Sequence, residues 1–115
     1  MTPSHWALYK SETTETHFIE HEYGFISYSL LPDALFLEDI WIAPEHRKSG
    51  LGAALVAQAE EVGREAGKQT SLALIHLSSK TSTESLKAHL TVGFLPFLAE
   101  DGKIWLRRAI APKGE

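Results

Sequence analysis

The pattern of apolar and polar residues predicts an antiparallel meander in the first part of the chain. A polar loop at residues 10–16 separates a short strand at residues 5–9 from a loosely alternating strand at residues 17–23. Residues 24–31 alternate more strongly, and residues 34–43 are apolar with few interruptions. We therefore expect four strands in succession before the first helix begins.

The apolar period becomes helical at residues 50–66. Apolar side chains recur there at the spacing of one helix face, and Gly67 stands where a glycine commonly ends a helix. A continuous apolar run at residues 71–77 follows, which is typical of a buried and often parallel strand. The predicted apolar stripe of the helix consists of Leu51, Leu55, Val62 and Ala66, with Ala54 and Ala59 beside them.

A second helix is predicted from residue 81 to about residue 92. Thr81 and Glu84 have the spacing of a capping box, in which each side chain bonds the backbone amide of the other residue. Gly93 then ends the helix. The second helix is therefore bounded at both ends by residues that favour helix termini.

Two more strands complete the chain, at residues 94–98 and 103–110. We expect Arg107 and Arg108 to be solvated charges on an edge strand. The strands before and after the first helix should be parallel and joined by a right-handed crossover. The predicted fold class is therefore α/β, a mixed sheet with helices on its faces.

A basic, glycine-containing turn joins the strand at residues 34–43 to the first helix. Gly50 and Gly52 lack the Cβ atoms that would keep a ligand away from the backbone. The first helical amides have no partner inside the helix and lie at the positive end of its dipole. The turn therefore predicts a phosphate site. The alternative is that the two glycines only allow the helix to pack closely on the sheet.

Other phosphate-binding motifs do not fit this turn. A Walker loop requires a lysine and a serine or threonine directly after its last glycine, and Ala53 and Ala54 follow Gly52 here. A dinucleotide-binding fingerprint requires a third glycine at a fixed spacing, which is missing. The phosphorylated ligand is therefore of another kind.

Composition narrows the classes of function further. The 115 residues fit one domain, residues 1–115, and a net charge of −4 argues against a nucleic-acid partner. The chain has no cysteine, which excludes disulfides, thiolate catalysis and zinc–sulfur sites and fits a reducing cytoplasm. Neither a signal-peptide pattern nor an apolar run of about 18 residues is present, so we expect a cytoplasmic protein without a membrane span.

The segment at residues 44–55 resembles the acetyl-CoA motif of the GNAT N-acetyltransferases. Arg47, Gly50 and Gly52 occupy the defining positions of that motif, after a strand that ends near a proline. The Gly93-Phe94 pair, between a helix and a strand, is similar to a second recurrent signal of the family. The resemblance extends over residues 17–110 and implies a GNAT-like fold that lacks most of the usual first helices.

This resemblance implies acetyl-CoA as the cosubstrate. No metal is expected, because the histidines at positions 5, 17, 21 and 46 do not have metal-ligand spacing. Backbone amides of the turn would hold the pyrophosphate of acetyl-CoA. The pantetheine arm would enter a wedge between the strands at residues 34–43 and 71–77 and pair with the backbone of the first of them. An amide near the end of that strand would polarise the thioester carbonyl. The predicted cofactor-binding residues are Trp41, Ile42, Arg47, Lys48, Ser49, Gly50, Leu51, Gly52 and Ala53.

His89 is the predicted acid for the leaving thiolate. It stands where many family members carry a tyrosine, four residues before the glycine of Gly93-Phe94, and an imidazole can donate a proton near neutral pH. The alternative is a surface or capping histidine. Ser82 likewise stands where many members carry an asparagine.

Glu38 is the predicted base for the amine, because a carboxylate in an apolar strand near the cofactor can accept a proton. Asp39 is the alternative base, since neighbours in a strand point to opposite faces. Both could instead mark a bulge at which the strand meets solvent. His76 could also contact the acceptor, although a core position is the preferred reading for a histidine in an apolar strand. Trp41 could line the pantetheine channel or pack in the core.

Residues 10–16 are too few for the helices that the family places between its first two strands. The acceptor site is therefore open, which suits a bulky acceptor such as a protein or peptide amine, or is completed by a second copy in a homodimer. The expected acceptor is a small-molecule amine or a protein or peptide amine. The predicted function is acetyl transfer from acetyl-CoA to a primary amine by direct attack. The alternatives are a non-catalytic acyl-CoA-binding module and an interaction domain without a cofactor.

Overall fold

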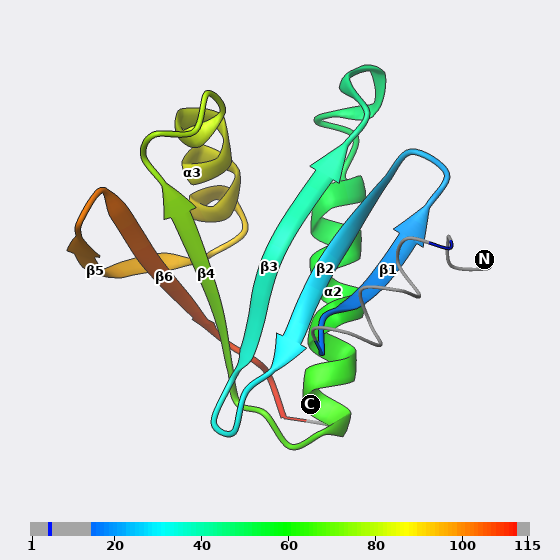
Figure 1. Cartoon of the computed structure of the whole chain (residues 1–115). Helices are drawn as coiled ribbons and strands as arrows, with labels where there is room; N and C mark the ends of the chain where they lie inside the picture. Colours follow the sequence, from blue (N-terminus) through cyan, green and yellow to red (C-terminus); the bar gives the residue numbers. More distant parts are fainter. Residues whose placement is uncertain (1–4, 6–14, 113–115) are drawn as a thin grey trace.

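The computed structural model describes residue 5 and residues 15–112, which include a six-stranded mixed sheet and two α-helices (Figure 1). Every element predicted from residue 17 onward is present, with ends that differ by one or two residues. The strand predicted at residues 5–9 lies outside the described residues apart from residue 5. The elements are β1 (His17–His21), β2 (Gly24–Leu30), β3 (Leu35–Ile42), the short 3-10 helix η1 (Pro44–His46), α2 (Leu51–Glu65), β4 (Thr70–His76), α3 (Ser82–Thr91), β5 (Leu95–Glu100) and β6 (Lys103–Ala109).

The strand order in the sheet is β1-β2-β3-β4-β6-β5. The first three strands form the expected antiparallel meander, and β3 and β4, joined by α2, are parallel as predicted. Strand β6 pairs with both β4 and β5, so it is internal. The prediction that Arg107 and Arg108 lie on an edge strand is therefore wrong, because pairing between strands distant in sequence sets the strand order.

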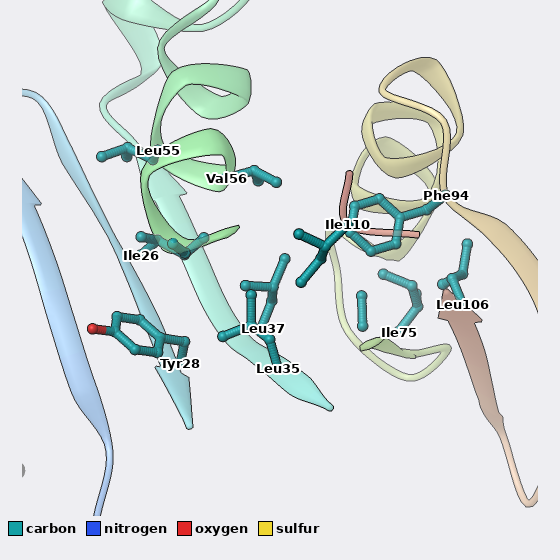
Figure 2. Close-up of a cluster of buried hydrophobic side chains, with 12 residues drawn as sticks. Ile26, Tyr28, Leu35, Leu37, Leu55, Val56, Ile75, Phe94, Leu106 and Ile110 are labelled. Atoms are coloured by element: carbon teal, nitrogen blue, oxygen red, sulfur yellow. The ribbon is translucent and has the colours of Figure 1, made fainter. Parts of the chain in front are cut away.

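Both described helices pack on the same face of the sheet, not on its two faces. Leu55 and Val56 of α2 belong to one buried cluster with Phe94, which directly follows α3 (Figure 2). Leu86 of α3 packs against that cluster. The other members of the cluster are Ile26, Tyr28, Leu35, Leu37, Ala59, Ala73, Ile75, Leu106 and Ile110.

The buried stripe of α2 differs in part from the predicted one. Its buried residues are Leu55, Val56, Ala59, Glu60 and Gly63, whereas Ala54 and Ala66 are exposed. The helix contacts the sheet along a row of residues four apart, as is common for packed helices. Gly63 lies on this row, and a Cβ atom there would come within 3.3 Å of Leu35.

Both helices end as predicted, but the second does not begin with a capping box. Gly67 and Gly93 have φ angles of 82° and 97°, which a glycine adopts without strain. The N-cap of α3 is Thr81, yet no side-chain hydrogen bond caps this helix. The Thr81 hydroxyl instead lies 3.3 Å from that of Ser79, since the turn before α3 brings these two side chains together.

Candidate functional site

Strands β3 and β4 separate after a short parallel stretch. Their pairing runs only from Leu35↔Ser71 to Leu37↔Ala73, and beyond it the two ribbons diverge (Figure 1). An irregularity on the other edge of β3 coincides with this point. Tyr28 of β2 pairs with Leu37 and Ser27 pairs with Asp39, so Glu38 is an additional residue, a β-bulge. The wedge expected between these strands is therefore present.

A cavity of about 420 Å³ lies between the diverging strands and α3, and we name it the slot. Val56 of α2 and His89 of α3 line it from the face that carries the helices. Phe36 lines it as well, and its ring contacts Trp105 with ring centroids 5.8 Å apart on the opposite face of the sheet. The slot is therefore lined by residues of both faces.

Glu38 lines the slot at the bulge. Its Oε2 atom is buried and has no hydrogen-bond partner in the structure. The neighbouring Asp39 is exposed and lines the slot as well, and its backbone amide donates to the Ser27 hydroxyl at 3.1 Å. The bulge considered for these residues is real, and it places one unpartnered carboxylate oxygen in the slot.

His89 lines the slot from α3. Its Nδ1 lies 2.7 Å from the carbonyl oxygen of Ser85, and a carbonyl can only accept, so Nδ1 carries the proton. This contact leaves Nε2 as the nitrogen available for proton transfer. Ser85 was not predicted as a site residue, although a position four residues before His89 is the ordinary place for such a partner.

His76 and Ser82 also line the slot. His76 is exposed at the end of β4, so the preferred interpretation of a core histidine is wrong. The reason is that His76 lies beyond the part of β4 that pairs with β3. Ser82, at the first turn of α3, donates weakly from its hydroxyl to the Leu77 carbonyl at 3.4 Å.

The predicted phosphate turn lies between β3 and α2 and is exposed. Gly50, the N-cap of α2, has a φ angle of 89°, and Lys48 has one of 63°. The first helical bond runs from the Ala54 amide to the Gly50 carbonyl at 3.0 Å, so the amides of Leu51, Gly52 and Ala53 have no helical acceptor. No side chain caps this end of α2, and its first turn contains no acidic residue.

The space around Gly50 and Gly52 at this end of the helix is open. A Cβ atom at Gly50 would meet nothing within 4 Å, and one at Gly52 would meet only the Ile40 side chain at 3.8 Å. Close helix–sheet packing therefore does not require these two glycines. The Arg47 side chain folds back, and its Nε donates to the Ile42 carbonyl at 2.9 Å. Lys48 and Ser49 are exposed beside the turn.

Trp41 and Ile42 lie at the end of β3. The Trp41 side chain is 49% exposed, so it is not a core residue, and it is not among the residues that line the slot. Ile42 is half-buried and packs against the core cluster. The two side chains point to opposite faces of the sheet, as neighbours in a strand do.

A second hollow, of about 330 Å³, lies beside the turn and was not predicted from the sequence. It lies on the side of β1 and β2, where the ring of Tyr23 stacks on that of His46 with centroids 3.5 Å apart. Residues 21–23 are distant from residue 46 in the sequence, so their association depends on the tertiary structure. Its wall includes Gly50 and Leu51.

The part of the chain that the structure describes contains no group of three or more His, Cys, Asp or Glu residues that could hold a metal ion. Among the same residues, no helix is long and apolar enough to cross a membrane.

Burial raises the pKa of the Tyr28 phenol above its ordinary value of 10.0.

The chain is similar to a known protein family and to several solved structures. The model of the acetyltransferase (GNAT) family matches residues 2–94. A crystal structure of a Desulfovibrio desulfuricans protein assigned to the GNAT acetyltransferases is 25% identical, with a TM-score of 0.71, and the match covers 84% of this chain and 69% of that one. No curated protein matches the chain.

Two further solved structures share the fold. Nourseothricin acetyltransferase is 26% identical with a TM-score of 0.66, and the match covers 77% of this chain and 58% of that one. PaiA N-acetyltransferase from Thermoplasma acidophilum, in complex with coenzyme A, is 16% identical with a TM-score of 0.68, over 76% of this chain and 53% of that one. The chain thus spans between half and seven-tenths of the length of these three proteins.

Proposed function

The chain belongs to the acetyltransferase (GNAT) family, and we propose that it transfers an acetyl group from acetyl-CoA to a primary amine by direct attack. The observation that carries the proposal is the slot, which is lined from both faces of the sheet and lies between β3 and β4, directly before the turn suited to phosphate. Two substrates can then meet within the sheet, one from each face. When bound, acetyl-CoA supplies the activated thioester.

The turn is proposed to bind the pyrophosphate. The amides of Leu51, Gly52 and Ala53 point out of the N-terminus of α2, and the open space at Gly50 and Gly52 lets an anion approach them. The cationic Arg47 and Lys48 lie beside the turn. A complex of PaiA N-acetyltransferase with coenzyme A has the same fold, which supports this choice of cosubstrate.

Between the turn and the slot, the edge of β3 that faces β4 is proposed to bind the pantetheine arm. Pairing with β4 ends at Leu37, so the backbone from Glu38 to Ile42 lacks a β4 partner. An amide at Trp41 or Ile42 would donate to the thioester oxygen as negative charge develops there. This role uses only backbone groups, which is consistent with the outward position of the Trp41 side chain.

Glu38 is proposed to accept a proton from the amine. Its Oε2 is buried in the slot and has no hydrogen-bond partner, so it is free to accept a proton from a bound amine. The exposed Asp39 beside it adds a second carboxylate, which favours a cationic acceptor in the slot. The acceptor amine, on a small molecule or on a peptide, would enter from the face that carries Phe36 and Asp39.

His89 is proposed to donate a proton to the leaving thiolate. The bond between its Nδ1 and the Ser85 carbonyl fixes the ring orientation. In the imidazolium form Nε2 also carries a proton, which it can transfer to sulfur. After transfer the imidazole is neutral and still bonded to Ser85, so the ring need not move during the step.

Thermal unfolding with acetyl-CoA, CoA, ATP and NADH at equal concentrations tests the cosubstrate. A ligand at 100 times its dissociation constant adds roughly 2.7 kcal/mol to the free energy of unfolding. We expect acetyl-CoA and CoA, but not NADH, to raise the melting temperature. Turnover with a panel of amines can then be followed by thiol release, since the protein has no cysteine of its own. A protein that none of the four ligands stabilises would refute the proposal.

A binding module without turnover is the second candidate. The observation in its favour is that Ser82 and His89 line the slot at positions where many family members carry asparagine and tyrosine. Stabilisation by acetyl-CoA, together with no thiol release for any amine, would support this candidate over the enzyme.

A further inference from the structure

A buried ionic cluster lies beneath the two helices, outside the slot. Glu60 of α2 is only 6% exposed, and Ser71 of β4 is fully buried. One Glu60 oxygen, Oε2, accepts from the Ser71 hydroxyl at 2.6 Å and from Arg108 Nε at 3.1 Å, and Oε1 accepts from Arg108 Nη2. The planar guanidinium of Arg108 thus holds the buried Glu60 carboxylate through two parallel hydrogen bonds, a geometry that a lysine cannot reproduce.

The same guanidinium also binds the end of α3. Arg108 Nη1 donates to the carbonyl of Val92, the C-cap of that helix. The Arg108 Cζ atom lies 5.1 Å from the centre of the Phe94 ring, which is a cation–π distance. Phe94 is fully buried and lies beside Leu106 and Ile110 at the end of α3 (Figure 2). One side chain of β6 therefore connects α2 to the C-terminus of α3.

His89 is part of this helix end. Its carbonyl accepts from the Phe94 amide at 3.0 Å, and the Leu90 carbonyl accepts from the Gly93 amide at 3.1 Å, which is the Schellman arrangement. The His89 ring meets the Phe94 ring edge-on, with centroids 5.4 Å apart. Any shift of Phe94 or of the C-terminus of α3 therefore moves the His89 imidazole.

Helix α3 is less deeply buried than α2. None of its residues is fully buried, whereas α2 buries five. Leu86 and Val92 pack against the core cluster, and the contacts of Arg108 with Val92 and Phe94 add a polar connection at the helix end beside the slot. A displacement of about 1 Å at a reacting group can reduce a rate roughly a hundredfold.

We infer that Arg108, held by Glu60, is a positioning residue for His89. This inference rests on the proposed acetyl transfer. Arg108 contacts neither substrate. It acts on His89 through the Val92 carbonyl and the Phe94 ring. Its function is to keep the distance between α2 and the end of α3 constant, so that the imidazole faces the slot in one orientation.

The test is a double-mutant cycle with Arg108→Lys and His89→Ala. Arg108→Lys keeps the charge and removes the paired hydrogen bonds of the guanidinium to the Glu60 carboxylate. We expect kcat to fall roughly tenfold or more while the dissociation constant of acetyl-CoA stays the same. In the His89→Ala background the same substitution should have no further effect on kcat. An equal loss of kcat in both backgrounds would overturn the inference, since it would mean that Arg108 acts on the fold in general.

Arg107→Lys is the matched control. Arg107 is the adjacent residue, is exposed and also stacks on a ring, that of Phe97 at 4.7 Å, but on the opposite face of the sheet. We expect its kcat to match that of the unmodified protein. A loss of kcat as large as that of Arg108→Lys would overturn the inference.

An imidazole NMR measurement tests the positioning without turnover. His89→Ala assigns the His89 ring signal, and Arg108→Lys should shift that signal but not those of the distant His17 and His21. An unchanged His89 signal would overturn the inference even if the proposed acetyl transfer holds. Lack of turnover by the unmodified protein would instead refute the proposed function and leave the NMR result to decide the geometry.

Discussion

Leu37 and Ile40 point to the same side of β3 although they are three residues apart. Both contact the core cluster, whereas residues at an odd spacing in a regular strand point to opposite faces. The bulge at Glu38 inserts one residue between Leu37 and Asp39 and reverses the alternation. It also marks the point where β3 leaves β4, so one irregularity both opens the slot and places a carboxylate in it.

Glu38→Gln should lower kcat by roughly 10²- to 10⁴-fold, because the amide cannot accept the proton of the amine. The free energy of unfolding should rise by about 1 kcal/mol, since a buried carboxylate oxygen without a partner is costly. Chemical denaturation and initial rates measure the two effects. Asp39→Asn, at the exposed neighbour, should keep most of the activity, and the reverse result would assign the base to Asp39.

His89→Ala should reduce kcat by roughly 10²-fold or more and leave the affinity for acetyl-CoA unchanged, since the imidazole acts only on the leaving sulfur. His89→Tyr, which restores the residue common in the family, should retain more activity than the alanine variant. Stopped-flow thiol release and calorimetric binding separate these quantities. His17→Ala, at an exposed position on β1, is the control. An unaltered kcat for His89→Ala would remove this residue from the mechanism.

Gly52→Leu should raise the dissociation constant of CoA tenfold or more, equal to at least about 1.4 kcal/mol, because the side chain would fill the space in front of the turn. The fold should tolerate the change, since a Cβ atom at this position meets only Ile40 at 3.8 Å. Isothermal titration with CoA gives the constant. Ala57→Leu, an exposed position further along α2, should bind CoA like the unmodified protein. Equal affinity of both variants would exclude the turn as the phosphate site.

Burial raises the pKa of the Tyr28 phenol, and this predicts a loss of stability at high pH. The unfolded chain ionises this group near pH 10, while the folded protein keeps it protonated to a higher pH. Its contribution is thus complete below pH 10 and is lost as the pH rises through the folded-state pKa.

Tyr28→Phe should remove this dependence. Denaturation between about pH 8 and about pH 11 should give a difference from the unmodified protein that changes with pH. Tyr23→Phe, at a more exposed tyrosine, is expected to keep the full dependence. A constant difference between Tyr28→Phe and the unmodified protein would contradict the prediction.

Much of the fold could be predicted from local patterns. Alternation located β2, an apolar run located β3, the helical period located α2, and Gly67 and Gly93 located the two helix ends, because each depends on residues close in sequence. The capping box at Thr81 failed since a nearby hydroxyl, that of Ser79, competes for its side chain. The GNAT family was predicted from the motif at residues 44–55, whose form depends on its own glycines. The wedge was predicted from the resemblance to that family.

The sequence by itself therefore determined the order of elements, the parallel crossover and the glycine-containing turn before α2, since these follow from backbone preferences and the apolar period. Only the tertiary structure decided that β6 lies inside the sheet, that Glu38 occupies a bulge, and that Arg108 joins Glu60 to the end of α3. The physical reason is that these depend on pairing between separate elements, and the contacts of Arg108 with Val92 and Glu60 join residues 16 and 48 positions apart. Such pairings are selected by packing and by the need to satisfy buried charge, and neither leaves a periodic signal in the chain.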